Sequence, residues 1–182
     1  GGVYRSDNGG TTWNRVSGSV SSRLPDAAVS HLALFPIDAT TVGFYPAVVS
    51  GPGRGIYRST DNGTSWQLIS NNIVDSVGLA TRIEFSVSAA GNKPVYAGLI
   101  STDDFGSDRL LNVFRSVRGT DLINNNNSGG VDEPAEATWT AIGSAPNINP
   151  GGSGLIHFSI LADKNVDNIV YVGGDSFTAG FG

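Results

Sequence analysis

Residues 57–66 have the sequence YRSTDNGTSW, which predicts a strand, a tight polar turn and the start of a returning strand. Asp61 can accept hydrogen bonds from backbone N–H groups of its own turn, as short acidic side chains do. Ser59 and Ser65 can join the two strand ends, and Trp66 can cover the hairpin with a large apolar surface. The stretch therefore predicts a β-hairpin that is held together by its own side chains.

The same pattern recurs twice along the chain. Residues 4–13, with the sequence YRSDNGGTTW, align with residues 57–66 at an offset of 53 residues. A third copy begins at residues 114–116 and ends at residues 138–139, but extra residues interrupt it, so it keeps the flanks and loses the turn. The predicted turn residues are Ser6, Asn8, Gly10, Thr12 and Trp13 in the first copy, and Ser59, Asp61, Gly63, Ser65 and Trp66 in the second. The glycine supplies a backbone angle that a side chain would penalise.

Short runs of alternating apolar residues follow each tryptophan in the same register. They begin at Leu32, Phe85 and Phe158, each 19 residues after a tryptophan, and alternation of period two is typical of a half-buried strand. Further strands are predicted at residues 42–44, 56–57, 66–69, 95–97, 113–114, 156–160 and 170–172. Four strands per unit of roughly 50 residues is typical of a propeller blade, and a β-sandwich is the alternative.

The pattern Ser-x-Asp-x-Gly-x-Ser/Thr-Trp resembles the Asp-box of the bacterial-neuraminidase-type repeats, which occur in sialidase-like and xyloglucanase-like β-propellers. The resemblance implies an all-β fold of four-stranded antiparallel blades with Asp-box hairpins, about three of them in this chain. The predicted division is a half blade at 1–29, a blade at 30–70, a blade at 80–143 with an insertion at 117–137, and a half blade at 154–182. A propeller ring needs about 4 to 8 blades. The partners predicted for closing the ring are the remaining blades of a longer chain or other copies of this chain.

Composition excludes several classes of function. The net charge is −5 and the chain has two lysines, so there is no basic stripe for a nucleic-acid partner. No apolar run approaches the roughly 20 residues of a membrane span. Cysteine is absent, which excludes disulfides and thiolate metal sites. A cysteine-free repeat rich in Ser, Thr, Asn and Gly is typical of a bacterial protein that is secreted or displayed on the cell surface.

Three polar residues stand at equivalent positions of the repeats. His31, Glu84 and His157 each lie 18 residues after a tryptophan, on the strand face opposite to the apolar run. Side chains at equivalent heights could line a central channel, where propellers bind ligands. The alternative is an ordinary polar residue at the end of a strand. A shared metal would require distances of about 2.0–2.2 Å to one ion, which ring symmetry opposes.

An acidic loop at residues 101–108 carries Asp103, Asp104 and Asp108 around a glycine. Oxygen-rich turns of this kind can hold calcium, although the spacing is not that of a helix-loop-helix calcium site, and a solvated loop is the alternative. No cofactor other than calcium is indicated. Together with Glu84, these aspartates are also the catalytic candidates for a glycoside hydrolase, which needs two carboxylates about 5–9.5 Å apart.

Three classes of function therefore follow from the sequence, of which a module that binds a glycan or protein ranks first. The second is part of a sialidase- or xyloglucanase-like glycoside hydrolase, and the third is a self-assembling surface-layer or filament subunit. The resemblance places the box residues at the outer rim, where they serve the fold. The repeated Arg5, Arg58 and Arg115 cannot meet at one substrate carboxylate, because equivalent positions point apart around a ring. The Arg-Ile-Pro motif that opens a sialidase domain and a tyrosine–glutamate pair are also missing.

Overall fold

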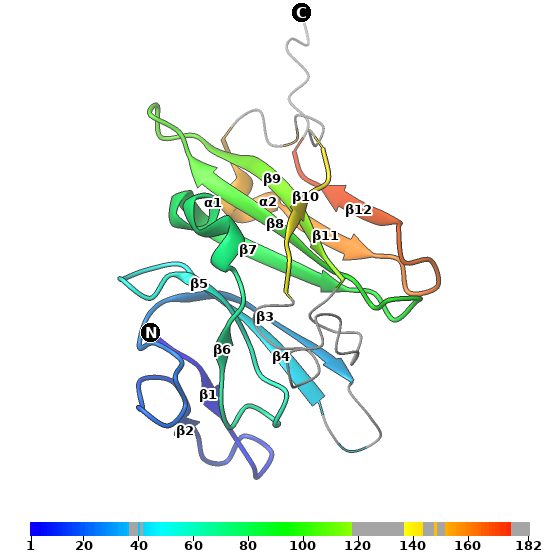
Figure 1. Ribbon diagram of the computed structural model, residues 1–182. Coiled ribbons are helices and arrows are strands. Elements are labelled where there is room, and N and C mark those ends of the chain that lie inside the picture. Colours follow the sequence, from blue (N-terminus) through cyan, green and yellow to red (C-terminus); the bar gives the residue numbers. More distant parts are fainter. Residues whose placement is uncertain (37–39, 41, 118–136, 144–147, 149–151, 176–182) are drawn as a thin grey trace, which may run out of the picture.

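The computed structural model describes residues 1–36, 40, 42–117, 137–143, 148 and 152–175. This part of the chain is mostly β and forms four antiparallel sheets, none of which closes on itself (Figure 1). The helices are short, namely η1 (Asn71–Ile73), α1 (Val74–Leu79) and α2 (Gly154–His157). Within the described residues, none of them has the length and apolar character needed to cross a membrane. Most of the insertion at 117–137 lies outside the described residues.

Two of the sheets have four strands each, in the order of the chain. The first contains β3 (Val29–Pro36), β4 (Val42–Val48), β5 (Gly55–Arg58) and β6 (Gln67–Leu68). The second contains β7 (Ala80–Val87), β8 (Val95–Thr102), β9 (Asp108–Ser116) and β10 (Thr140–Ala141). Every strand is antiparallel to its neighbours. The stretch 57–66 joins the third and fourth strands of the first sheet.

The other two sheets have two strands each. One contains β1 (Tyr4–Arg5) and β2 (Asn14–Arg15), and the other β11 (Ser159–Ala162) and β12 (Val170–Gly173). By sequence, β1 and β2 are equivalent to the third and fourth strands of a four-stranded sheet, whereas β11 and β12 are equivalent to its first and second strands.

The strand predicted at 156–160 is wrong in its first half, because α2 occupies this stretch and β11 begins only at Ser159. A tertiary contact explains the difference. Gly154 packs directly on the backbone of Asp108, where an added Cβ would lie 2.7 Å from the carbonyl oxygen, and Ser153 forms a parallel bridge with Asp108. The start of α2 is thereby held against β9.

The main core lies between the two four-stranded sheets. Phe85 of β7 packs on Tyr45 of β4 with ring centroids 6.2 Å apart, and Phe35 of β3 stacks on Tyr45 at 4.9 Å. Large aromatic surfaces of this kind contribute most of the burial that holds two sheets together. A second contact between sheets uses Phe158, whose ring lies against Gly98 of β8, where an added Cβ would be 2.3 Å away.

Equivalent apolar residues differ sharply in burial. Phe85 and Phe158 are 4% and 3% exposed, because each packs against the preceding sheet. Leu32, their equivalent on β3, is 45% exposed, and Leu34 is exposed as well. The sequence pattern predicts that Leu32 lies on the buried face of a half-buried strand. Both leucines are exposed because the sheet before β3 contains only β1 and β2 and has no first and second strands to cover them.

Candidate functional site

We call the hairpins at residues 4–13 and 57–66 the first and the second box. The turn of the second box is closed by a network of short-range hydrogen bonds. The Ser59 hydroxyl accepts the Gly63 N–H at 2.9 Å and donates to Asp61 Oδ1 at 2.8 Å. Asp61 Oδ1 also accepts the N–H groups of Thr64 and Ser65 at 3.0 and 2.9 Å, and Asp61 Oδ2 accepts the Ser65 hydroxyl at 2.6 Å. Burial raises the pKa of the Asp61 carboxyl, but the hydrogen bonds from Ser65, Ser59 and Thr64 outweigh it and hold this pKa below its ordinary value.

The first box repeats the network with an amide in place of the carboxylate. Asn8 Oδ1 accepts the Thr12 N–H at 2.9 Å, and the Ser6 hydroxyl accepts the Gly10 N–H at 2.8 Å. Asn8 Nδ2 donates to the Thr12 hydroxyl at 2.8 Å, so this side-chain hydrogen bond runs in the opposite direction to that in the second box. In both boxes, the polar side chains are engaged within their own hairpin.

The two box tryptophans differ in their surroundings. Trp66 is buried beside Phe44, with ring centroids 6.2 Å apart, and its ring also lies against Gly63. Trp13 is exposed on the two-stranded sheet. The Trp13 ring nevertheless lies near Gly10, where an added Cβ would be 3.8 Å from it, as Trp66 lies near Gly63. Both tryptophans therefore lie against their own hairpins, and they differ in burial.

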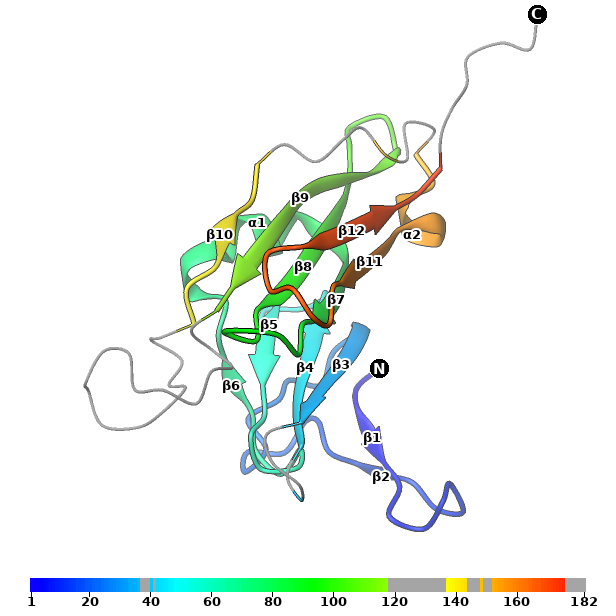
Figure 2. The same cartoon turned by 90° about the vertical axis from the view of Figure 1, so that its right-hand side faces the viewer.

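The first strands of successive sheets lie side by side, with β7 between β3 and β11 (Figure 2). Ser30 of β3 uses its hydroxyl to donate to the Ile83 carbonyl at 2.9 Å and to accept the Ile83 N–H at 3.0 Å. His31 Nδ1 accepts the Phe85 N–H at 2.8 Å. Side chains of β3 thus satisfy backbone groups of β7 that face away from its own sheet.

The next pair of first strands is joined in the same way. The Ser86 hydroxyl of β7 accepts the Ala162 N–H at 2.7 Å, and the Ser88 hydroxyl donates to the Asp163 carbonyl at 2.6 Å. Neither serine was singled out by the sequence, although Ser86 lies in β7, Ser88 directly follows it, and a spacing of two residues places both on one face.

Two of the three predicted channel residues, His31 and Glu84, lie on the first strands β3 and β7, and all three enter separate interactions. Glu84 pairs with Arg82 on the same strand, and Arg82 also donates to the Leu155 carbonyl of α2. His157 lies in α2 and not on a strand, and its Nδ1 is 2.7 Å from Asp175 Oδ1. We call His31, Arg82, Glu84, His157 and Asp175 the first-strand strip.

Burial sets the protonation of His31. It lowers the pKa of this imidazole, with Glu84 acting to raise the pKa and Arg82 to lower it further. The neutral ring fits the geometry, because an unprotonated Nδ1 is needed to accept the Phe85 N–H. Among the described residues, no three His, Asp or Glu side chains are grouped so that they could hold a metal ion.

The sequence missed two members of the strip. Arg82 could have been found, because it lies two residues before Glu84 and therefore on the same strand face. Asp175 carries no such signal, because it is 18 residues from His157 and only the tertiary structure brings them together.

The acidic turn between β8 and β9 is closed by its own carboxylates. Asp103 Oδ1 accepts the N–H groups of Phe105 and Ser107 at 3.0 and 2.8 Å, and Asp108 Oδ1 accepts the Thr102 hydroxyl at 2.5 Å. Asp104 is exposed at the turn. Calcium at this loop stays a prediction.

The catalytic candidates do not form a glycosidase-like pair around Glu84. Glu84 lies opposite Gly98 of β8, and Asp103 follows five residues further along the chain. A strand rises about 3.3 Å per residue, so five residues of extended chain place the two acids roughly 17 Å apart. This exceeds the separation of about 5–9.5 Å that hydrolysis of a glycosidic bond requires.

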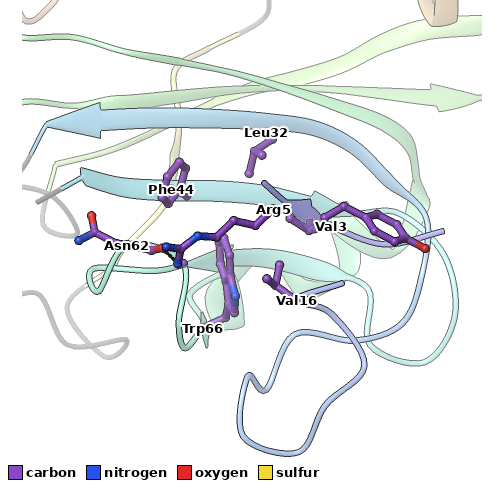
Figure 3. Close-up of a pocket in the computed structure, with 9 residues that line it drawn as sticks. Val3, Arg5, Val16, Leu32, Phe44, Asn62 and Trp66 are labelled. Atoms are coloured by element: carbon purple, nitrogen blue, oxygen red, sulfur yellow. Dashed lines mark hydrogen bonds between the residues drawn. The ribbon is translucent and has the colours of Figure 1, made fainter. Parts of the chain in front are cut away.

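An apolar cavity of about 110 Å³ opens between the β1–β2 sheet and the first four-stranded sheet (Figure 3). Its lining consists of Val3, Tyr4, Arg5, Val16, Leu32, Phe44, Asn62, Gly63 and Trp66. Arg5 crosses one side of the cavity and donates from Nη1 to the Asn62 carbonyl at 3.2 Å. No sequence motif predicted this cavity.

No family model matches the chain, and no curated protein or solved structure matches it either. The first-strand strip combines a carboxylate–imidazole pair, a carboxylate–guanidinium pair and a neutral imidazole in one region of the fold. Such a surface offers both donors and acceptors of hydrogen bonds to a polar ligand.

Proposed function

We propose that this chain is a segment of a β-propeller with Asp-box hairpins, secreted or displayed at a cell surface, and that it acts as a binding or scaffold module for a glycan or a protein. The observation that carries the architecture is the order of the strands. Each four-stranded antiparallel sheet runs in chain order, and the first strands of successive sheets lie side by side. Successive propeller blades have this arrangement around a central channel.

The repeated sequences support the same architecture. The hairpins at 4–13 and 57–66 share both their sequence pattern and their hydrogen bonds, with the amide of Asn8 standing in for the carboxylate of Asp61. The network satisfies the turn locally, so its residues are engaged in the fold and a ligand must bind elsewhere.

Binding is favoured at the exposed end of the first-strand strip. The side chains of His157 and Asp175 remain 53% and 38% exposed although they pair with each other. A carboxylate and an imidazole held in a fixed geometry can bind the hydroxyl groups of a sugar or the polar groups of a peptide. Exposure at the surface of a cysteine-free, mildly acidic chain is consistent with an extracellular module.

The test is binding of the purified chain to an array of sialylated glycans and xyloglucan oligosaccharides. We expect the Asp175→Asn and His157→Ala variants to bind the captured glycan at least about tenfold more weakly, which corresponds to the loss of about 1.4 kcal/mol. Lys164→Ala is the control, because Lys164 lies in the turn after β11, outside the strip. Equal binding by the strip variants and the control would place the ligand elsewhere and refute the proposal.

A further inference from the structure

The two half-sheets of this chain are complementary. The β1–β2 sheet repeats the third and fourth strands of a complete sheet, and the β11–β12 sheet repeats the first and second strands. In the complete sheets, the second strand pairs directly with the third, as β8 does with β9. Within the described residues, β12 pairs only with β11 and β1 only with β2. Within one copy, β12 and β1 lie well apart in both views of the fold (Figures 1 and 2).

Apolar residues are exposed at these half-sheets, whereas their equivalents elsewhere are buried. Tyr171 of β12 is 55% exposed, whereas the equivalent Tyr96 of β8 is 1% exposed. The same contrast separates Trp13 from Trp66. Tyr4 of β1 and Leu161 of β11 are also exposed, and so is Leu32 of β3, which lines the cavity beside the β1–β2 sheet. Large apolar side chains gathered on an open sheet edge mark an interaction surface.

We propose that β12 of one copy of this chain pairs with β1 of a second copy, so that two half-sheets form one four-stranded sheet. The proposal rests on the propeller architecture proposed above and names the partner that completes it. A second copy fits because the chain itself carries the missing pair of strands, with the sequence that the other sheets use at the same position.

The register of the new pairing follows from β8 and β9. There Tyr96 lies opposite Arg115, Val95 opposite Ser116 and Ala97 opposite Phe114. The equivalent pairs across the two copies are Tyr171 with Arg5, Val170 with Ser6, and Val172 with Tyr4.

One pair of side chains provides a specific contact. The Arg115 guanidinium lies over the Tyr96 ring at 5.8 Å, and its Nε donates to the tyrosine hydroxyl at 3.2 Å. Arg5 and Tyr171 are both substantially exposed and can make the same cation–π contact between copies. Arg5 Nε donates to Asp7 Oδ1 at 2.7 Å, so the equivalent hydrogen bond to the Tyr171 hydroxyl requires this Nε to leave Asp7.

The cavity and the exposure of Leu32 are explained by the same pairing. Phe158 packs against Gly98, and the equivalents of these two residues are Leu32 and Gly173. A second copy that pairs along β1 brings its Gly173 toward Leu32, at the wall of the apolar cavity (Figure 3). The cavity is then filled by the partner's strands and no longer open to water.

The assembly that we propose is a dimer. The described part of each copy contributes two four-stranded sheets and two half-sheets, and the half-sheets join into one further sheet per copy when both junctions form. Two copies then give six blades, within the range of about 4 to 8 that closes a propeller ring, whereas three copies exceed it. Each dimer contains the β12–β1 junction twice.

The first measurement is the mass of the full chain in solution by light scattering. We expect twice the chain mass of 18.8 kDa. Tyr171→Asp should shift the protein to the monomer, whereas Phe105→Asp should leave the dimer intact, because Phe105 is also exposed but lies in the β8–β9 turn, away from the junction. A wild-type monomer, or the same response to both variants, would overturn the proposal.

Cross-linking tests the register independently of the mass. The chain has no cysteine, so Tyr4→Cys and Val172→Cys can be introduced in separate preparations and mixed under oxidation. We expect disulfide-linked pairs from this mixture and few from Tyr4→Cys with Tyr171→Cys, because adjacent strand residues face opposite sides. Equal cross-linking in both mixtures would refute the register. If the junction fails but Asp175→Asn still weakens glycan binding, the binding proposal stands without the dimer.

Discussion

Replacing Asp61 by alanine should destabilise the fold by about 2 kcal/mol at neutral pH. The carboxylate accepts hydrogen bonds from the backbone of Thr64 and Ser65 and from the hydroxyls of Ser59 and Ser65. A hydrogen bond to a charged group contributes about 1.5–3 kcal/mol when it is buried, but Asp61 is exposed and water replaces part of each one. The comparable loss of an acidic helix cap costs about 0.5–2 kcal/mol.

Asp61→Asn should cost less, about 1 kcal/mol, because the first box shows that an amide fits the same hairpin. Asn8 keeps the backbone hydrogen bond to Thr12 and reverses the side-chain one. In the variant, the Ser65 hydroxyl has to rotate and accept from the amide. The remaining cost is the loss of charge assistance in the other hydrogen bonds.

Acidification provides a second readout. The folded pKa of Asp61 lies below its ordinary value, so the unfolded chain takes up this proton first as the pH falls. The stabilisation by the carboxylate is therefore present above pH about 4 and is lost as the pH falls through the lowered pKa. The amide of the Asp61→Asn variant cannot titrate, so the gap in stability between the wild type and this variant should shrink with acidification.

The assay is urea unfolding followed by tryptophan fluorescence, at neutral pH and near pH 3. Asn8→Ala is the matched control, and its effect should be smaller, below about 1 kcal/mol, because its hairpin belongs to the two-stranded sheet and is exposed. An Asp61→Ala variant within about 0.5 kcal/mol of the wild type would refute the role of the network. If the difference in the free energy of unfolding between the wild type and Asp61→Asn did not change with pH, the stabilisation by the charge of Asp61 would be refuted.

Two further substitutions test how the sheets are joined, both by urea unfolding. His31→Leu should cost about 1–3 kcal/mol, because it leaves the Phe85 N–H without its acceptor. The pKa of His31 is lowered in the folded state, so the wild type should lose stability as the pH falls below about 6.5. The leucine variant should lack this loss. A leucine variant that loses stability with acid in the same way would show that His31 is not its source. Gly98→Ala should cost about 1–3 kcal/mol, because its Cβ would lie 2.3 Å from the Phe158 ring. Gly78→Ala is the control, because no atom lies near its added Cβ, and it should be neutral or stabilising by up to about 1 kcal/mol. An equal loss of stability in the Gly98→Ala and Gly78→Ala variants would refute the close contact between Gly98 and Phe158.

Local side-chain patterns predicted much of the β structure. The strands β3, β4, β7, β8 and β12 cover the stretches where alternation and β-branched residues predicted them. The start of α2 was missed because it depends on contact between Gly154 and Asp108, which are 46 residues apart. The pairing of His157 with Asp175 was missed for the same reason, because no local pattern links the two residues.

The sequence by itself determined the box hairpins, because their hydrogen bonds join residues no more than four positions apart. It also determined which residues occupy equivalent positions of the repeats. Only the tertiary structure decided which of these equivalents are buried. Leu32 and Phe85 occupy the same position of the repeated sequence pattern, but their burial depends on a covering sheet. The described sheet before β3 has only two strands and leaves Leu32 exposed, whereas β7 packs on a complete four-stranded sheet that buries Phe85.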